Sequence, residues 1–173
     1  MSTYGEEVII YPEDPKTKDL ADALKTAKFG SVFDQRRINV KPSCRGWEDA
    51  VEIAIKNCDL KRFSKRRIII LIDFDKQGTR LSEVKQRIPP ECASKFYIVG
   101  WSGNIEELKH QTDCAGKGVH KLAEKLVDDC QPECHGLWER PEFAQMREST
   151  SDSKSECERL RTELLPFISQ KTP

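Results

Sequence analysis

RRIIILIDFD, residues 66–75, is the stretch of the sequence that decides the fold. Its five consecutive aliphatic residues, Ile68 to Ile72, leave no polar face, and two aspartates, Asp73 and Asp75, close the segment. A surface helix or a half-exposed strand needs a polar side, so this pattern predicts a strand that is buried on both faces. Strands of this kind are typical of parallel sheets with helices on both sides.

Three further strands and four helices are predicted around this central strand. The strands fall where β-branched and aromatic residues gather, at residues 6–11, 38–40 and 96–99, and we expect Gly100 to end the last of them. The helices are predicted at residues 17–27, 47–57, 79–88 and 104–110, the last one capped by Asn104. Strands and helices therefore alternate, which predicts an α/β fold with a mostly parallel four-stranded sheet and helices on both faces.

The C-terminal third of the chain shows helical patterns only. Helices are predicted at residues 119–127, 137–146 and 157–168, with a serine-rich loop at 148–156. We therefore expect two parts, an α/β domain over residues 1–115 and a C-terminal helical extension over residues 116–173 that packs on it.

The charges of the chain cancel, with 29 Lys and Arg against 29 Asp and Glu. A net charge of zero argues against a protein that coats nucleic acid or membrane by bulk electrostatics, but it leaves room for a local site. The longest apolar run is far shorter than the ~20 residues of a membrane span, and the N-terminus lacks the pattern of a signal peptide. We expect a cytoplasmic protein with no membrane partner.

The chain contains 7 cysteine residues at irregular spacing. This irregularity does not favour a disulfide framework. The densest patch is Cys130, Cys134 and His135. Structural zinc sites usually show two paired knuckles, whereas this patch has one loose pair, so free thiols are favoured and a metal site stays the alternative.

Acidic residues follow two of the predicted strands. Glu13 comes after the first strand, and Asp73 and Asp75 come after the central one. Functional groups gather at the carboxyl ends of strands in open parallel sheets, and an extended segment would point both aspartates to one side. If the two strands are neighbours, three carboxylates meet, and such oxygen ligands suit Mg²⁺ or Mn²⁺. Alternatively, these aspartates only form a turn or cap a helix.

Two motifs give this arrangement a resemblance to the Toprim fold, the catalytic domain of topoisomerases, primases and OLD-family nucleases. VIIYPEDPKTKDLADAL (residues 8–24) corresponds to the first Toprim motif, and IIILIDFDKQG (residues 68–78) corresponds to the second. The chain is more closely similar to small bacterial Toprim-like proteins found beside ATPases. That likeness rests on LIDFD, RLSEVKQRIP and FYIVG, and on LAEKLVDDC, ERLR and LLPFI downstream.

The resemblance implies a Mg²⁺-dependent phosphodiesterase or nuclease. Glu13, Asp73 and Asp75 would be the catalytic and metal-binding residues, with Glu13 as the general acid or base and the two aspartates holding the ion. It also implies nucleic acid as the substrate and an ATPase as the protein partner. The chain departs from the family pattern at Asp14, where Toprim domains carry a Gly, and at Lys76 and Gln77, where many carry an acid or a small residue.

Lys76 and Arg80 flank the acidic residues. They are predicted to bind a substrate phosphate; alternatively, they balance the charge of the aspartates. Trp101 follows the fourth strand at the same edge and is predicted either to line the site or to anchor a loop.

Three other functions stay open. One is a non-catalytic Toprim-like interaction subunit, for which the missing Gly is an indication. The second is a haloacid-dehalogenase-type phosphatase with Asp73 as nucleophile, because Asp73-Phe74-Asp75 followed by Gly78-Thr79 partly matches its signature. The third is a receiver-like phosphoacceptor domain, but no clear lysine follows the fourth strand.

Overall fold

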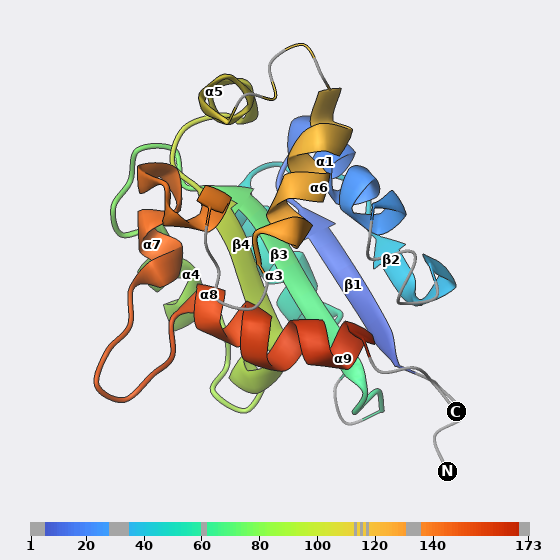
Figure 1. Cartoon of the computed structure of the whole chain (residues 1–173). Helices are drawn as coiled ribbons and strands as arrows, with labels where there is room; N and C mark the ends of the chain where they lie inside the picture. The colour runs from blue at the N-terminus through green and yellow to red at the C-terminus, as the bar shows by residue number, and fades with distance from the viewer. Residues whose placement is uncertain are drawn as a thin grey trace.

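The computed structural model describes residues 6–27, 35–59, 62–112, 114, 116, 118–130 and 136–169. Four parallel strands form one sheet in the order β2-β1-β3-β4 (Figure 1). Their bounds are Glu7–Pro12 for β1, Ile38–Val40 for β2, Arg66–Asp73 for β3 and Phe96–Trp101 for β4. The prediction of an α/β fold with a parallel four-stranded sheet is confirmed.

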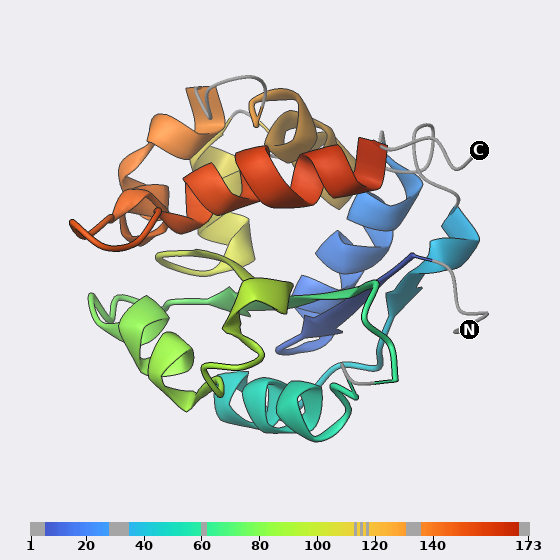
Figure 2. The ribbon, with the colours of Figure 1, turned by 90° about the horizontal axis from the view of Figure 1, so that it is seen from below.

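Helices cover both faces of this sheet, as the view from below shows (Figure 2). One face carries α1 (Pro15–Thr26), α6 (Gly118–Asp128), α8 (Glu156–Arg159) and α9 (Leu165–Ser169). The other face carries α3 (Trp47–Lys56) and α4 (Arg80–Arg87). The short helix α5 (Ile105–Gln111) follows β4 and begins at the predicted cap, because the Asn104 side chain accepts a hydrogen bond from the Glu107 N–H. Within the described ranges, every helix is too short or too polar to span a bilayer.

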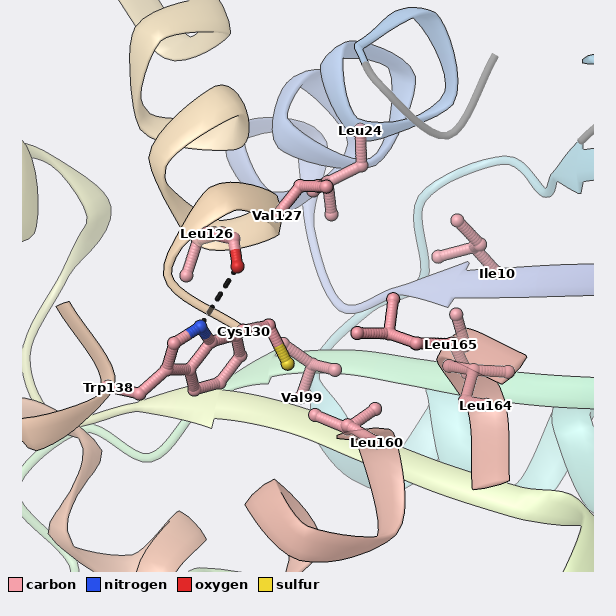
Figure 3. Close-up of a pocket in the computed structure, with 11 residues that line it drawn as sticks. Ile10, Leu24, Val99, Leu126, Val127, Cys130, Trp138, Leu160, Leu164 and Leu165 are labelled. Carbon is pink, nitrogen blue, oxygen red and sulfur yellow. Dashed lines mark hydrogen bonds between the residues drawn. The ribbon is translucent and has the colours of Figure 1, made fainter. Parts of the chain in front are cut away.

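The hydrophobic core is centred on β3. Residues Ile68 to Ile72 are at most 6% exposed, as the absence of a polar face predicted. A small cavity of about 50 Å³ lies between the sheet and α6. It is lined by aliphatic side chains and by Cys130 and Trp138 (Figure 3). The Trp138 indole N–H donates to the Leu126 carbonyl at 2.9 Å, so its polar atom is satisfied. This space is too small for a substrate, and we regard it as a packing void.

The C-terminal residues belong to the same core as the sheet. Leu160 and Leu164 are buried against the strands beside the cavity, together with residues of α6 (Figure 3). The predicted domain boundary near residue 115 stays a prediction, since the described core is continuous across it.

The helix predicted at residues 137–146 is wrong over most of its length. Two 3₁₀ helices, Gly136–Glu139 and Pro141–Phe143, precede the one-turn helix α7 (Ala144–Arg147). Pro141 has no N–H to donate, which explains why a continuous α-helix does not form. The last helix contains a π-helical segment, Leu160–Leu164, just before Pro166, whose ring is incompatible with a regular turn.

The free edge of β4 is covered by charged side chains of α8. Glu156 is fully buried, and its Oε2 accepts a hydrogen bond from the Ile98 N–H at 3.0 Å. The Glu156 Oε1 pairs with Lys85 Nζ at 3.1 Å and with Arg159 Nη1 at 2.8 Å. Arg159 in turn donates to the Phe96 carbonyl at 2.8 Å. These bonds use the groups with which a further strand would pair.

We predict that Glu156→Ala lowers the free energy of unfolding by about 3–5 kcal/mol. The substitution leaves the Ile98 N–H and the Arg159 guanidinium without their carboxylate in a buried site. Urea denaturation measures the change. Glu158→Ala, two residues along the same helix, is the matched control and should cost less than about 1 kcal/mol. Equal effects of the two substitutions would contradict this role of Glu156.

Candidate functional site

Glu13 and Asp73 meet at the carboxyl ends of the two central strands. β1 and β3 are neighbours, with Pro12 opposite Leu71, so the residues that follow them emerge at the same edge. The Glu13 N–H continues this pairing and donates to the Leu71 carbonyl at 3.0 Å. The Glu13 Oε2 accepts a hydrogen bond from the Asp73 N–H at 2.9 Å. The acidic side chain after β1 is therefore joined directly to the backbone of the motif after β3.

Asp75 follows Asp73 in a turn and not in the extended conformation that the sequence analysis expected. β3 ends at Asp73, and Asp75 has a φ of 48°, so the segment turns instead of continuing extended. Aspartate is one of the residues that adopt this left-handed conformation, because its short polar side chain bonds locally. The Asp75 N–H donates to Asp73 Oδ1 at 3.0 Å. The Asp75 side chain is 65% exposed, whereas Asp73 is half-buried.

Phe74 anchors this turn between the two aspartates. Its side chain is fully buried, and its N–H donates to the Trp101 carbonyl at 2.6 Å. The Asp75 carbonyl accepts from the Gly103 N–H, also at 2.6 Å. Trp101 is itself fully buried, so it anchors the loop and does not line an open site. β4 runs on through Gly100 to Trp101, so the expected end of the strand at Gly100 is wrong.

Gly100 is required by the packing of Phe74. A Cβ added at Gly100 would collide with the Phe74 ring and would lie 2.8 Å from the Ile72 carbonyl oxygen. The glycine therefore lets the ring sit against the backbone of β4. The sequence signal for this role was the glycine itself, which interrupts a run of strand-forming residues and can mark a close approach.

Asp14 has a structural role at the start of α1. Its Oδ1 accepts from the Thr17 N–H at 2.7 Å, and its own N–H donates to Thr17 Oγ1 at 2.9 Å. This is a capping box at the start of α1, and Pro15 occupies the first helical position. Because Asp14 directly follows Glu13, this cap fixes the backbone position of Glu13 at the start of α1.

Crowding at the strand ends perturbs both half-buried carboxyl groups. Burial raises the pKa of Glu13 from 4.5 to about 7; the Asp73, Asp14 and Asp75 charges add to the rise, and the bond from the Asp73 N–H opposes it. Burial, followed by the neighbouring Asp75 carboxyl, raises the pKa of Asp73 from 3.8 to about 6, against the opposing effect of the Asp75 N–H. Both groups therefore titrate near neutral pH, as carboxyl groups at functional sites often do.

Arg80 lies beside the exposed member of this acidic group. Its Nη2 lies 4.0 Å from Asp75 Oδ2, and its Nε lies 3.7 Å from Glu83 Oε2. Its guanidinium is stacked 4.5 Å from the centroid of the Trp47 ring, which Arg87 also contacts at 4.6 Å. The Nε and Nη1 atoms of Arg80 are buried, and neither has a hydrogen-bond partner among the described residues. Lys76 is exposed on the turn.

Gln145 holds the loop that follows the acidic turn. Its Nε2 donates to the Gln77 carbonyl at 2.8 Å, and its Oε1 accepts from the Leu81 N–H at 3.0 Å. A third bond from the C-terminal part joins the Ser102 N–H to the Glu142 carbonyl at 2.7 Å. Sequence reasoning missed these contacts, because no local pattern connects residues 40 or more positions apart.

The donor chemistry of Glu13, Asp73 and Asp75 fits a divalent cation, since carboxylate oxygens suit such ions and neighbouring carboxyl groups contribute to the raised pKa values of Glu13 and Asp73. Their side chains are not gathered around one point: within the described ranges, no group of three or more Asp, Glu, His or Cys is arranged to hold a metal ion. Of the cysteine-rich patch, Cys130 is buried in the core, whereas Cys134 and His135 lie outside the described residues.

Comparison of the chain with protein-family models, curated proteins and solved structures finds no match.

We predict that Glu13→Gln changes the pH dependence of stability. Because the folded pKa of Glu13 is raised from 4.5 to about 7, the folded state binds more protons than the unfolded state between these values. The stability of the wild type therefore falls as the pH rises through this range, and the substitution removes this loss while its amide oxygen still accepts from Asp73. At pH 8 the variant should be more stable by about 1–2 kcal/mol, after allowance for solvent screening, and at pH 4 it should show no such gain.

Denaturation with urea at several pH values measures this difference. Asp152→Asn, at an exposed loop position, is the matched control and should give a difference that does not change with pH. A pH-independent effect of Glu13→Gln would show that the Glu13 carboxyl does not have a raised pKa.

We also predict that Gly100→Ala destabilises the fold by about 1–3 kcal/mol, because the new methyl group displaces the Phe74 ring. Gly78→Ala is the control, since an added Cβ meets nothing within 4 Å there. Thermal unfolding compares the two variants. Equal melting temperatures for both would contradict the tight contact between Gly100 and Phe74.

Proposed function

We propose that the protein is a Toprim-type, Mg²⁺-dependent phosphodiesterase or nuclease. The observation that carries the proposal is the bond between the Glu13 carboxylate and the Asp73 N–H, which joins the acidic residues of two adjacent strand ends. The parallel α/β sheet supports it, because functional groups of such sheets gather at this edge. The two motifs that resemble Toprim domains contribute these same residues.

In this proposal, Asp73 and Asp75 hold a divalent cation that Glu13 borders. The bound cation would neutralise charge on the non-bridging phosphate oxygens and lower the pKa of a water ligand. Mn²⁺ would serve the same role with these oxygen ligands. The Asp75 side chain is exposed and can rotate toward the ion, whereas the half-buried Asp73 side chain has less freedom. Asp75 would therefore be the ligand that moves when the ion binds.

Glu13 is proposed as the group that accepts or donates a proton. A pKa of about 7 leaves its carboxyl group divided between both protonation states at neutral pH, which is the best range for acid–base catalysis. Its bond to the Asp73 N–H fixes its orientation. A bound cation would lower this pKa, so the same carboxyl would then act mainly as a base.

Arg80 and Lys76 are proposed to bind the substrate phosphate. The Trp47 ring holds the Arg80 guanidinium in place, and the Arg80 Nη2 lies 4.0 Å from Asp75 Oδ2. Lys76, exposed beside Asp75, has the freedom to reach a phosphodiester. We further propose a nucleic acid substrate, an ATPase partner and a cytoplasmic location, all from the resemblance to small Toprim-like proteins.

We predict that the full chain cleaves plasmid or single-stranded nucleic acid in Mg²⁺ or Mn²⁺. Asp73→Asn should lower the cleavage rate by at least about 100-fold, because it removes a metal-binding charge at nearly constant volume. Asp152→Asn is the matched control and should cleave like the wild type. Gel assays with and without a chelator measure these rates.

Two outcomes would overturn the proposal. Absence of cleavage with either metal, alone or with the proposed ATPase partner, would favour a non-catalytic interaction subunit. Hydrolysis of a small phosphomonoester with an aspartyl phosphate trapped on Asp73 would instead identify a phosphatase.

A further inference from the structure

Two cysteines that are far apart in the sequence lie in contact at the edge of the sheet where the strands begin. The Sγ atoms of Cys58 and Cys92 are 3.5 Å apart, although 34 positions separate the residues. Cys58 follows the end of α3, and Cys92 follows α4 in the connection to β4. They lie away from the acidic residues, which follow the opposite ends of the strands.

We propose that Cys58 and Cys92 are a modification site that closes reversibly into a disulfide by exchange with a low-molecular-weight disulfide. This inference does not depend on the proposed nuclease activity.

The backbone on each side of the pair is held by hydrogen bonds. The Cys58 N–H donates to the Ile55 carbonyl at 3.2 Å, and the Cys92 N–H donates to the Pro89 carbonyl at 2.9 Å. Near Cys58, the Arg66 guanidinium donates to the Asn57 carbonyl at 3.3 Å. Each cysteine therefore lies on a hydrogen-bonded turn, and the fold places the two sulfurs 3.5 Å apart. A disulfide needs a sulfur separation of about 2 Å, so the two sulfurs have to approach each other by about 1.5 Å to form the bond.

Access distinguishes this pair from most other cysteines of the described chain. Cys58 and Cys92 are half-buried, whereas Cys114, Cys130 and Cys157 are buried. A small disulfide reagent can therefore reach the pair without opening the core. Cys44 is also half-buried, and the described residues place no second sulfur within bonding reach of it, so it serves as an internal comparison.

The exchange occurs in two balanced steps. One thiolate of the pair attacks a sulfur of the reagent, which forms a mixed disulfide and releases one reagent thiolate. The other thiolate then attacks the protein sulfur of the mixed disulfide and releases the second reagent thiolate. The two protein thiols lose two protons and two electrons, and the reagent disulfide becomes two thiols. An excess of dithiol reverses both steps.

The environment of Cys58 makes the exchange slow at neutral pH. Burial, followed by the hydrogen bond with Cys92, raises the pKa of Cys58 to about 11; the charge of Asp59 adds to the rise, and that of Arg66 opposes it. Because the thiolate is the reacting form, a mildly alkaline buffer is the appropriate condition for the test.

The bond would connect the end of α3 to the connection between α4 and β4. The closed loop, residues 58–92, contains all of β3, the turn of Asp73 and Asp75, and helix α4. Such a cross-link restricts the unfolded chain more than the folded one, so it stabilises the fold. The expected increase in melting temperature is at least about 5 °C for a chain of this size.

The test uses the full reduced chain and oxidised glutathione. We expect a mass decrease of two hydrogen atoms, one cross-linked peptide pair that contains Cys58 and Cys92, and the increase in melting temperature. Cys58→Ser and Cys92→Ser should each prevent the cross-link and the increase. Cys44→Ser is the matched control and should retain both.

The wild-type measurement decides the question even if a serine variant folds poorly. A cross-link between other cysteines would overturn the proposal. So would a folded chain that keeps both thiols free, or one that stops at a mixed disulfide with glutathione. Dithiothreitol should restore the original mass and melting temperature, and failure to do so would overturn the reversibility of the site.

Discussion

The burial of β3 on both faces is the constraint on which the other elements depend. A strand with five consecutive buried aliphatic residues has no contact with water through its side chains, so helices have to lie on each side of it. Its backbone N–H and C=O groups also need partners, and parallel pairing with β1 and β4 supplies them. The connections between parallel strands then have to cross the sheet, which places α1, α3 and α4 where they are found.

The same constraint explains the chemistry at the end of the strand. Asp73 is the first polar residue after the buried run, so its carboxyl group lies at the border of a low-dielectric core. Glu13 meets the same border one strand away. Neither carboxyl can be fully hydrated, and nearby acidic groups add to the cost of ionising each one: Asp73 for Glu13, and Asp75 for Asp73. Removing one charge, or adding a cation, relieves this cost, so the ionised carboxyls at this position lower the stability of the fold.

Much of this could be predicted from the sequence because it depends on local pattern. The aliphatic run of β3 predicts its burial, and adjacent parallel strands bring Glu13 and Asp73 to one edge. The left-handed turn at Asp75 was not predicted, because it depends on the Gly103 N–H bound to the Asp75 carbonyl from another loop. The contact between Cys58 and Cys92 was missed for a similar reason. Neither residue belongs to a motif, and only the packing of α3 beside the connection to β4 brings them together.

The C-terminal part of the chain restricts how a protein partner can bind. A sheet with a free edge can accept a strand from another chain, and β4 would offer such an edge if Glu156 and Arg159 were absent. Because the buried Glu156 and the half-buried Arg159 already bond to β4, a partner that added a strand there would have to break these bonds and leave the Glu156 carboxylate without its backbone partner. The other edge strand, β2, spans only three residues, Ile38–Val40, and gives little backbone for pairing. The proposed ATPase would therefore have to dock on the helices or on the loops around the acidic turn. Those loops are held by Gln145 and by the Glu142 carbonyl, so a partner that moved this part of the chain would also move the groups around Asp73 and Asp75.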